Sequence, residues 1–286
     1  MSKNKVLACI LGLITCLVIS VIVWYFTLIG RAQKLTDHYP VYSKQMNDYQ
    51  LVAKKPAHWV SLKKISNSLK WAIVLSEDWA FYDHHGIDFN QLQKAIEESL
   101  DEGKLTRGAS TITQQVVKNA FLSHDRTITR KIKEILIAQE LETILSKDRI
   151  LEHYLNLIEL GKGIYGVKAG AKFYFDKEPH DINPKEAAFL AMLLPSPKRY
   201  SQSFTKKELT DFASTQITKI LEKMKIAKVM SEEELEYYKS HPLSFEKGMQ
   251  EDNILANDYL EEKLIMNDFE EDIFAKEPPA DAILED

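Results

Sequence analysis

Glu77 and Asp78 form a carboxylate pair at the expected end of a helix, followed by aromatic residues, histidines and Gly86. A carboxylate held beside a reacting hydroxyl can act as a general base, which typically contributes about 10²–10⁴ in rate. Taken alone, Glu77 is a weak signal, because most acids at helix ends are simply solvated. The pair becomes informative only together with the residues that follow it.

A run of small, hydroxyl and amide residues, RGASTITQQ, occupies positions 107–115. Such residues allow a polar ligand to approach the backbone and the side chains closely. The alternative interpretation is an ordinary helix start, with Ser110 or Thr111 as the N-cap.

A cationic cluster comes next, and its basic residues are Lys118, Arg126, Arg130, Lys131 and Lys133. Glu134 follows them directly. Charged donors of this kind can stabilise the negative charge of a phosphate or diphosphate. The alternative is a solvated basic face, in which Arg130 and Glu134 pair four residues apart on a helix.

Several common kinds of site are absent from the sequence. It has no Walker loop, dinucleotide fingerprint, zinc-ligand spacing or Ser-His-Asp order, which argues against the common nucleotide-binding and metallohydrolase classes. Cys9 and Cys16 both lie in the apolar N-terminal segment. The rest of the chain therefore has no disulfide framework, thiolate nucleophile or cysteine-based metal site.

Residues 6–29 are uncharged and rich in Leu, Ile and Val, with basic residues on both sides. About 20 apolar residues span a bilayer. The alternative is a cleaved signal peptide, but its apolar region usually has only about 7–15 residues. The sequence therefore predicts an uncleaved anchor, with a slight bias of flanking charge toward a cytoplasmic N-terminus.

The elements that must position these residues are expected to be mainly helices. With only 10 Gly and 9 Pro in 286 residues, turn-forming residues are scarce. Apolar residues recur at helical spacing, and Asn183 with Pro184 is typical of a helix start. The expected helices cover residues 69–79, 88–100, 111–122, 129–145, 147–160, 187–194 and 206–230, followed by a capping box at 231–234.

Five ordered motifs in this chain resemble those of the family 51 peptidoglycan glycosyltransferases. They are EDWAFYDHHG (77–86), GASTITQQ (108–115), RKIKE (130–134), RILEHYLN (149–156) and GIYGV (163–167). The likeness continues through FYF (173–175) and the apolar stretch 186–195, and covers about residues 65–230. Ala109 stands where many members have Gly, and Trp79-Ala80 where many have polar residues.

The resemblance implies a mainly α fold, with a lysozyme-like lobe and a smaller membrane-facing lobe, preceded by one transmembrane helix. It implies the monofunctional, membrane-anchored type, because no transpeptidase domain follows. The expected organisation is a cytoplasmic N-terminus (1–5), a transmembrane anchor (6–29), a juxtamembrane region (30–62), the glycosyltransferase domain (63–230), a C-terminal helix (231–250) and an acidic, disordered tail (251–286).

The reaction implied by the resemblance is polymerisation of lipid II into linear glycan strands. A β-1,4 bond forms with inversion, and undecaprenyl diphosphate leaves, so a direct attack suffices without a covalent intermediate. Glu77 matches the family's general base, and Glu134 matches its second acid near the donor diphosphate. No cofactor is expected to be required, although a divalent cation, Mg²⁺ or Mn²⁺, bound by Glu134 at the diphosphate stays open as an alternative.

The resemblance also assigns the substrate-binding residues. The phosphate ligands are expected to be Lys118, Arg126 and Lys133. Asp78 is expected to support the general base, and Ser110 and Gln115 to contact sugar or phosphate. For Arg130 and Lys131 we expect a structural rather than a catalytic role.

The expected partners are lipid II, the growing lipid-linked glycan and membrane lipids, with no nucleic acid. The expected location is the bacterial inner membrane, crossed once, with the catalytic domain on the periplasmic or extracytoplasmic side. Residues 251–286 hold 13 acidic and 2 basic side chains, a net charge of -11. A tail this acidic is expected to be mobile and dispensable for chemistry, and could recruit other wall-synthesis proteins or screen the cationic cluster.

Two other classes of protein compete with this interpretation. A wall-degrading glycosidase could use a helix-end Glu77 on the same polymer, but it does not require the cationic cluster. An inactive membrane scaffold would not need Glu77 and Glu134, both of which are intact.

Overall fold

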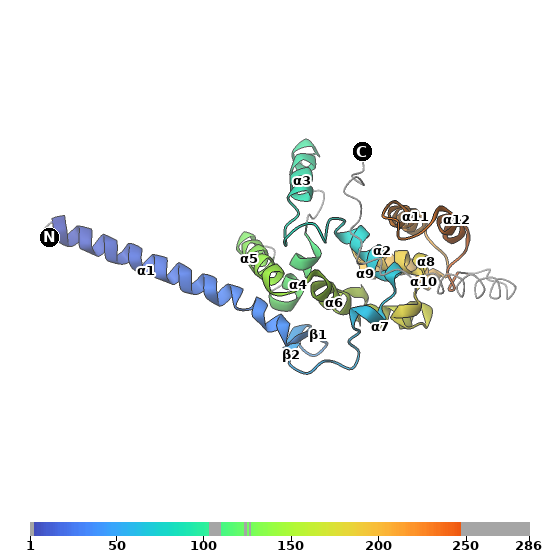
Figure 1. Cartoon of the computed structure of the whole chain (residues 1–286), viewed down its shortest axis with the longest axis horizontal. Helices are drawn as coiled ribbons and strands as arrows, with labels where there is room; N and C mark the ends of the chain where they lie inside the picture. Colours follow the sequence, from blue (N-terminus) through green and yellow to red (C-terminus); the bar gives the residue numbers. More distant parts are fainter. Residues whose placement is uncertain (1–2, 103–109, 123–124, 126, 247–286) are drawn as a thin grey trace. The chain divides into compact units, whose positions relative to one another are not determined.

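The computed structural model describes residues 3–102, 110–122, 125 and 127–246. Their structure is mostly helical, which confirms the expected fold class (Figure 1). The chain divides into two compact units: unit 1 comprises residues 1–55 and 85–150, and unit 2 comprises residues 56–84 and 151–286. Arg126 and the acidic tail lie outside the described residues.

Unit 1 begins with the long helix α1 (Lys3–Ile29), followed by the short 3-10 helix η1 (Ala32–Thr36). Within the described residues, one helical segment, Ile10–Thr36, is long and apolar enough to cross a membrane. Leu28, Ala32 and Leu35 are buried at its carboxyl end. They lie where α1 and η1 contact helix α5 (Ile128–Ile144), so the end of the apolar helix is packed into unit 1.

The other described elements of unit 1 are a hairpin and several helices. Strands β1 (Tyr39–Ser43) and β2 (Asp48–Val52) pair antiparallel, within the expected juxtamembrane region, for which no strands were predicted. The helices are α3 (Phe89–Glu102), α4 (Ile112–Phe121) and α5 (Ile128–Ile144), and α6 (Lys147–Leu157) begins in this unit. Thr111 and Thr127 cap α4 and α5, since each side chain accepts a hydrogen bond from a backbone N–H of the first turn.

The core of unit 2 is formed where α2 (Asn67–Glu77), α8 (Pro184–Leu193) and α11 (Asp211–Ile226) contact one another (Figure 1). Every residue of α8 from Lys185 to Leu193 is buried. Asn183 caps α8 and forms a capping box with Glu186, which confirms the expected helix start. This apolar helix is therefore the central element against which α2 is held.

Smaller elements complete unit 2: β3 (Glu159–Gly161), β4 (Ile164–Tyr165), α7 (Val167–Phe175), η2 (Leu62–Lys64), η3 (Pro179–Asp181), α9 (Pro197–Tyr200) and α10 (Gln202–Lys206). Some expected helices are shorter in the structure. The one expected at 147–160 ends at Leu157, where β3 follows. The one expected at 206–230 runs only from Asp211 to Ile226, because the chain turns at Lys207, whose backbone is left-handed. The one expected at 231–250 ends at Ser240.

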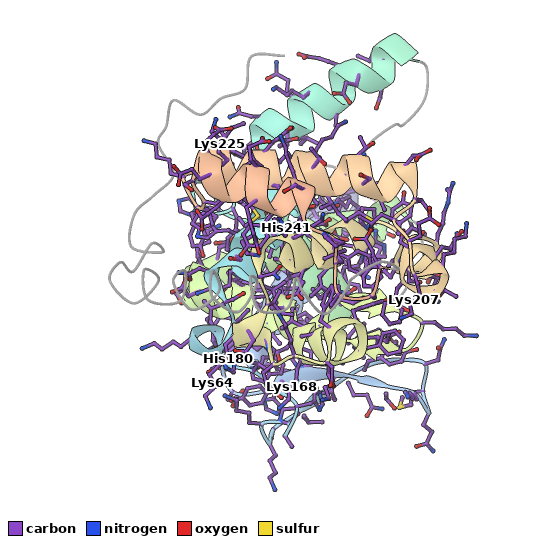
Figure 2. All side chains as sticks on the ribbon, turned by 90° about the vertical axis from the view of Figure 1, so that its right-hand side faces the viewer. Lys64, Lys168, His180, Lys207, Lys225 and His241 are labelled. Atoms are coloured by element: carbon purple, nitrogen blue, oxygen red, sulfur yellow. The ribbon has the colours of Figure 1, made fainter. Side chains whose placement is uncertain are left out.

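The C-terminal part of unit 2 is anchored on α8. Helix α12 (Glu232–Ser240) starts at the expected capping box between Ser231 and Glu234. At its other end, the buried Lys185 ammonium donates to the backbone carbonyls of Lys239 and His241, and burial lowers the pKa of Lys185. Figure 2 labels His241 at this position.

Phe245 closes an aromatic cluster just after α12. It is 8% exposed, and its ring centroid lies 5.1 Å from that of Phe189 and 5.3 Å from that of Phe204. The Lys207 ammonium, also labelled in Figure 2, lies 3.9 Å from the centroid of the Phe204 ring. Residues after α11 therefore belong to the core of this unit.

Candidate active site

Glu77 is the last residue of α2 and is half-buried. The preceding residues, from Leu69 to Leu75, are all buried, so the helix that carries Glu77 is held firmly in unit 2. The Lys223 ammonium donates to the Leu75 carbonyl at 3.1 Å and satisfies a backbone acceptor in the last turn. Glu77 thus lies at the end of a well-anchored helix, and its role as the general base stays a prediction.

Asp78 caps the carboxyl end of α2 and pairs with His84. The imidazole Nε2 lies 2.9 Å from Oδ1 and 3.1 Å from Oδ2 of Asp78, and both side chains are almost fully buried. Sequence reasoning included His84 in the first motif but gave it no role. The pair ties the ends of the segment 78–84 together directly after Glu77. The supporting role expected of Asp78 stays a prediction.

The second group of candidate residues lies in unit 1 around Glu134. Its side chain is 2% exposed, and each carboxylate oxygen meets a cation. Arg130 Nη1 is 2.5 Å from Oε2, and Lys131 Nζ is 2.5 Å from Oε1. The pair between Arg130 and Glu134 is therefore present, and burial distinguishes it from the solvated pair of the alternative interpretation.

Lys131 joins α5 to the start of α4. Besides Glu134, its ammonium donates to Ser110 Oγ at 2.9 Å and to Gln114 Oε1 at 2.8 Å. The structure thus brings Ser110, Lys131 and Glu134 together. Gln114, which sequence reasoning did not assign, belongs to the same group, and its position within the amide-rich run was the available signal.

Gly86 is packed against both helices of this group. Its φ is +80°, and a Cβ added there would lie 3.1 Å from the backbone of Ala138 in α5. Its carbonyl accepts hydrogen bonds from Thr111 Oγ1 at 2.9 Å and Gln114 Nε2 at 3.1 Å. Only glycine suits this position, because the left-handed backbone and the close approach both disfavour a side chain.

The remaining predicted site residues are placed less specifically. Gln115 is half-buried and Lys118 is exposed, both on α4, and Lys133 is half-buried on α5. Arg126 lies outside the described residues. The assignment of Lys118, Arg126 and Lys133 to phosphate therefore stays a prediction.

The described residues contain no group of three or more His, Cys, Asp or Glu that could hold a metal ion. At Glu134, a divalent cation would meet the positive charges of Arg130 and Lys131, each 2.5 Å from a carboxylate oxygen. Like charges this close repel strongly in a buried site. The arrangement suits an anionic ligand near the cations better than a metal on Glu134.

Comparison with known proteins identifies the family of the chain. The family model described as Transglycosylase matches residues 43–225. Proteins named biosynthetic peptidoglycan transglycosylase are similar to the chain. The one from Chromobacterium violaceum is 38% identical over 198 residues, which cover 66% of this chain and 86% of the relative. The one from Aromatoleum aromaticum is 40% identical over 186 residues, covering 63% and 80%. The one from Shewanella denitrificans is 49% identical over 144 residues, covering 50% and 62%. The chain belongs to the transglycosylase family.

Proposed function

We propose that this protein is a peptidoglycan glycosyltransferase that polymerises lipid II into linear glycan strands. The observation that carries the proposal is the family match over residues 43–225, which includes Glu77 at the end of α2 and the buried cluster around Glu134. The relatives are named for the biosynthesis of peptidoglycan. This favours synthesis over the wall-degrading and scaffold alternatives.

The proposed reaction is one direct displacement. The 4-hydroxyl oxygen of lipid II attacks the anomeric carbon of the donor, while Glu77 takes the hydroxyl proton. The bond between the anomeric carbon and the diphosphate oxygen breaks, and the bonding electrons leave with undecaprenyl diphosphate. The leaving group is already activated, so we propose that no energy cofactor is needed.

Negative charge on the departing diphosphate requires cationic groups placed in advance. In the proposal, Lys118, Arg126 and Lys133 supply this charge. Lys131 holds Ser110 and Gln114 in place beside Glu134, which supports a contact of these polar groups with the diphosphate or the sugar. The two cations on Glu134 fix the position of its carboxylate.

The protein is membrane-anchored through its apolar N-terminal helix. Four large apolar residues of α3 are exposed, and they recur three or four positions apart, on one face: Phe89, Leu92, Ile96 and Leu100. An exposed amphipathic helix in an anchored protein is suited to the bilayer interface, where lipid-linked substrates also reside. We propose that the domain lies on the extracytoplasmic side, and that the acidic tail contacts other wall-synthesis proteins.

Polymerisation of labelled lipid II by the purified full-length chain tests the proposed function. We expect polymer on a gel with the wild type. Glu77→Gln should lower the rate by about 10² or more, because it removes the general base with little change in shape. Glu236→Gln, an exposed substitution on α12, is the matched control. A wild type that makes no polymer, or a Glu77→Gln variant as active as the control, would contradict the proposal.

A further inference from the structure

A second buried carboxylate, Glu142, lies on α5 beyond Glu134. Its side chain is 3% exposed. Oε1 accepts a hydrogen bond from Thr113 Oγ1 at 2.5 Å and pairs with Lys147 Nζ at 2.9 Å. Glu142 lies eight positions after Glu134, which places it about 80° around α5 and about 12 Å farther along its axis.

The first turn of α4 is therefore held to α5 from two directions. Gln114 bonds to Lys131, which pairs with Glu134, whereas Thr113 bonds to Glu142 two turns farther along α5. Adjacent residues of a helix point about 100° apart, so the two connections oppose rotation of α4 about its own axis. That rotation decides where Gln115 and Lys118 point.

Stability alone gives little reason for a charge at this position. Thr113 is fully buried, and the Lys147 side chain is 17% exposed. A buried ion pair is often no more stabilising than well-packed apolar residues of similar volume, because both charges must be desolvated. The buried Glu142 carboxylate instead fixes geometry. Its hydrogen bond from Thr113 constrains both the position and the angle of that side chain.

We propose that Glu142 is a positioning residue for glycosyl transfer, which acts through Thr113 to hold α4 in the orientation that the substrate requires. This inference rests on the proposed function. Glu142 does not contact the reacting atoms. Its carboxylate sets the rotation of α4, and Lys147 holds that carboxylate in place.

The test measures kcat/KM on lipid II and the thermal midpoint Tm for single and double variants of the full-length chain. Thr113→Val keeps the shape of the side chain and removes the hydroxyl, whereas Thr113→Ser keeps the hydroxyl. Glu142→Gln removes the charge, and Glu140→Gln on the same helix is the matched control. Rates are measured well below the Tm of every variant, so that only folded protein is compared.

We expect Thr113→Val and Glu142→Gln each to lower kcat/KM by about tenfold or more, as loss of one interaction of about 1.4 kcal/mol would do. Thr113→Ser should stay within about threefold of the wild type. The double variant Thr113→Val with Glu142→Gln should have the same kcat/KM as the single variants, because each substitution removes the same hydrogen bond. If Glu142→Gln fails to fold, the comparison of Thr113→Val with Thr113→Ser still decides.

Each other outcome overturns the inference in a recognisable way. If Glu142→Gln lowers only the Tm and keeps the rate of Glu140→Gln, Glu142 is merely structural. Equal rates for Thr113→Val and Thr113→Ser would show that the Thr113 hydroxyl does not matter. If the losses of kcat/KM in the two single variants add up in the double variant, Thr113 and Glu142 act independently, and the inference is also wrong. Wild-type polymer with unaffected variants contradicts the positioning role alone, whereas a wild type without polymer contradicts the proposed function as well.

Discussion

Replacing Lys131 with methionine is the most direct test of how unit 1 organises its polar cluster. The substitution Lys131→Met keeps an unbranched chain of similar length and removes the ammonium. Ser110 Oγ, Gln114 Oε1 and Glu134 Oε1 then lose a common donor that lies 2.5–2.9 Å from each of them. Arg130 remains bonded to the other oxygen of Glu134.

The size of the effect follows from these contacts. A hydrogen bond to a charged group contributes about 1.5–3 kcal/mol, but three such values do not add, and solvent can replace some of them. The Lys131 side chain is 37% exposed, so its interactions are partly screened. We therefore expect a loss of about 2 kcal/mol in the free energy of unfolding, which lowers the Tm by about 4–8 °C for a chain of this size.

At the assay temperature the variant should still be almost entirely folded, so the loss of rate should reflect catalysis and not unfolding. If the same 2 kcal/mol is lost from the transition state, kcat/KM falls about 30-fold, since about 1.4 kcal/mol is a factor of ten. Polymerisation of labelled lipid II gives the rate, and differential scanning fluorimetry gives the Tm. Lys44→Met, at an exposed lysine between β1 and β2, is the control for the substitution itself.

Two results would refute the reasoning on Lys131. A rate and a Tm equal to those of Lys44→Met would show that the three hydrogen bonds do not matter. The second result is a rate of Lys131→Met that returns to the wild-type value at high salt, while its Tm does not change. Salt screens charges but does not restore lost hydrogen bonds, so this result would indicate a nonspecific effect of charge.

Three further predictions follow from other parts of the molecule. Lys118→Gln should raise KM for lipid II and weaken binding of moenomycin, the phosphoglycolipid inhibitor implied by the family resemblance, and unchanged binding would place the phosphate site elsewhere. Phe245→Ala should cost about 3–5 kcal/mol, or roughly 10 °C in Tm, because it empties a buried aromatic site, whereas Phe212→Ala, 46% exposed, should cost far less. A C-terminal reporter that is active only after export should be active, and activity of a cytoplasm-only reporter would contradict the proposed orientation.

Much of the fold could be predicted from local patterns. The start of α8 was readable from Asn183 and Pro184, because N-cap chemistry depends only on residues within one turn. The same holds for the capping box at Ser231. The hairpin at residues 39–52 was not predicted, because pairing of β1 with β2 is decided by contacts across the two strands and with α4. The break at Lys207 was also missed, since no Gly or Pro marks it.

For the active site, the sequence determined the residue types and the pairs that lie on one helix. Arg130, Lys131 and Glu134 are three or four positions apart, so α5 alone makes them neighbours. The motifs also indicated Glu77 as the general base, and that role stays a prediction.

Only the tertiary structure decided which groups from different elements meet. Lys131 reaches Ser110 across 21 positions, and Thr113 reaches Glu142 across 29 positions, because α4 packs against α5. The structure also decided that Glu134 is buried, so its ion pairs with Arg130 and Lys131 are held in place and are not solvated surface pairs. Spacing along the chain cannot reveal either result, because burial and contacts between helices depend on how whole apolar faces pack together.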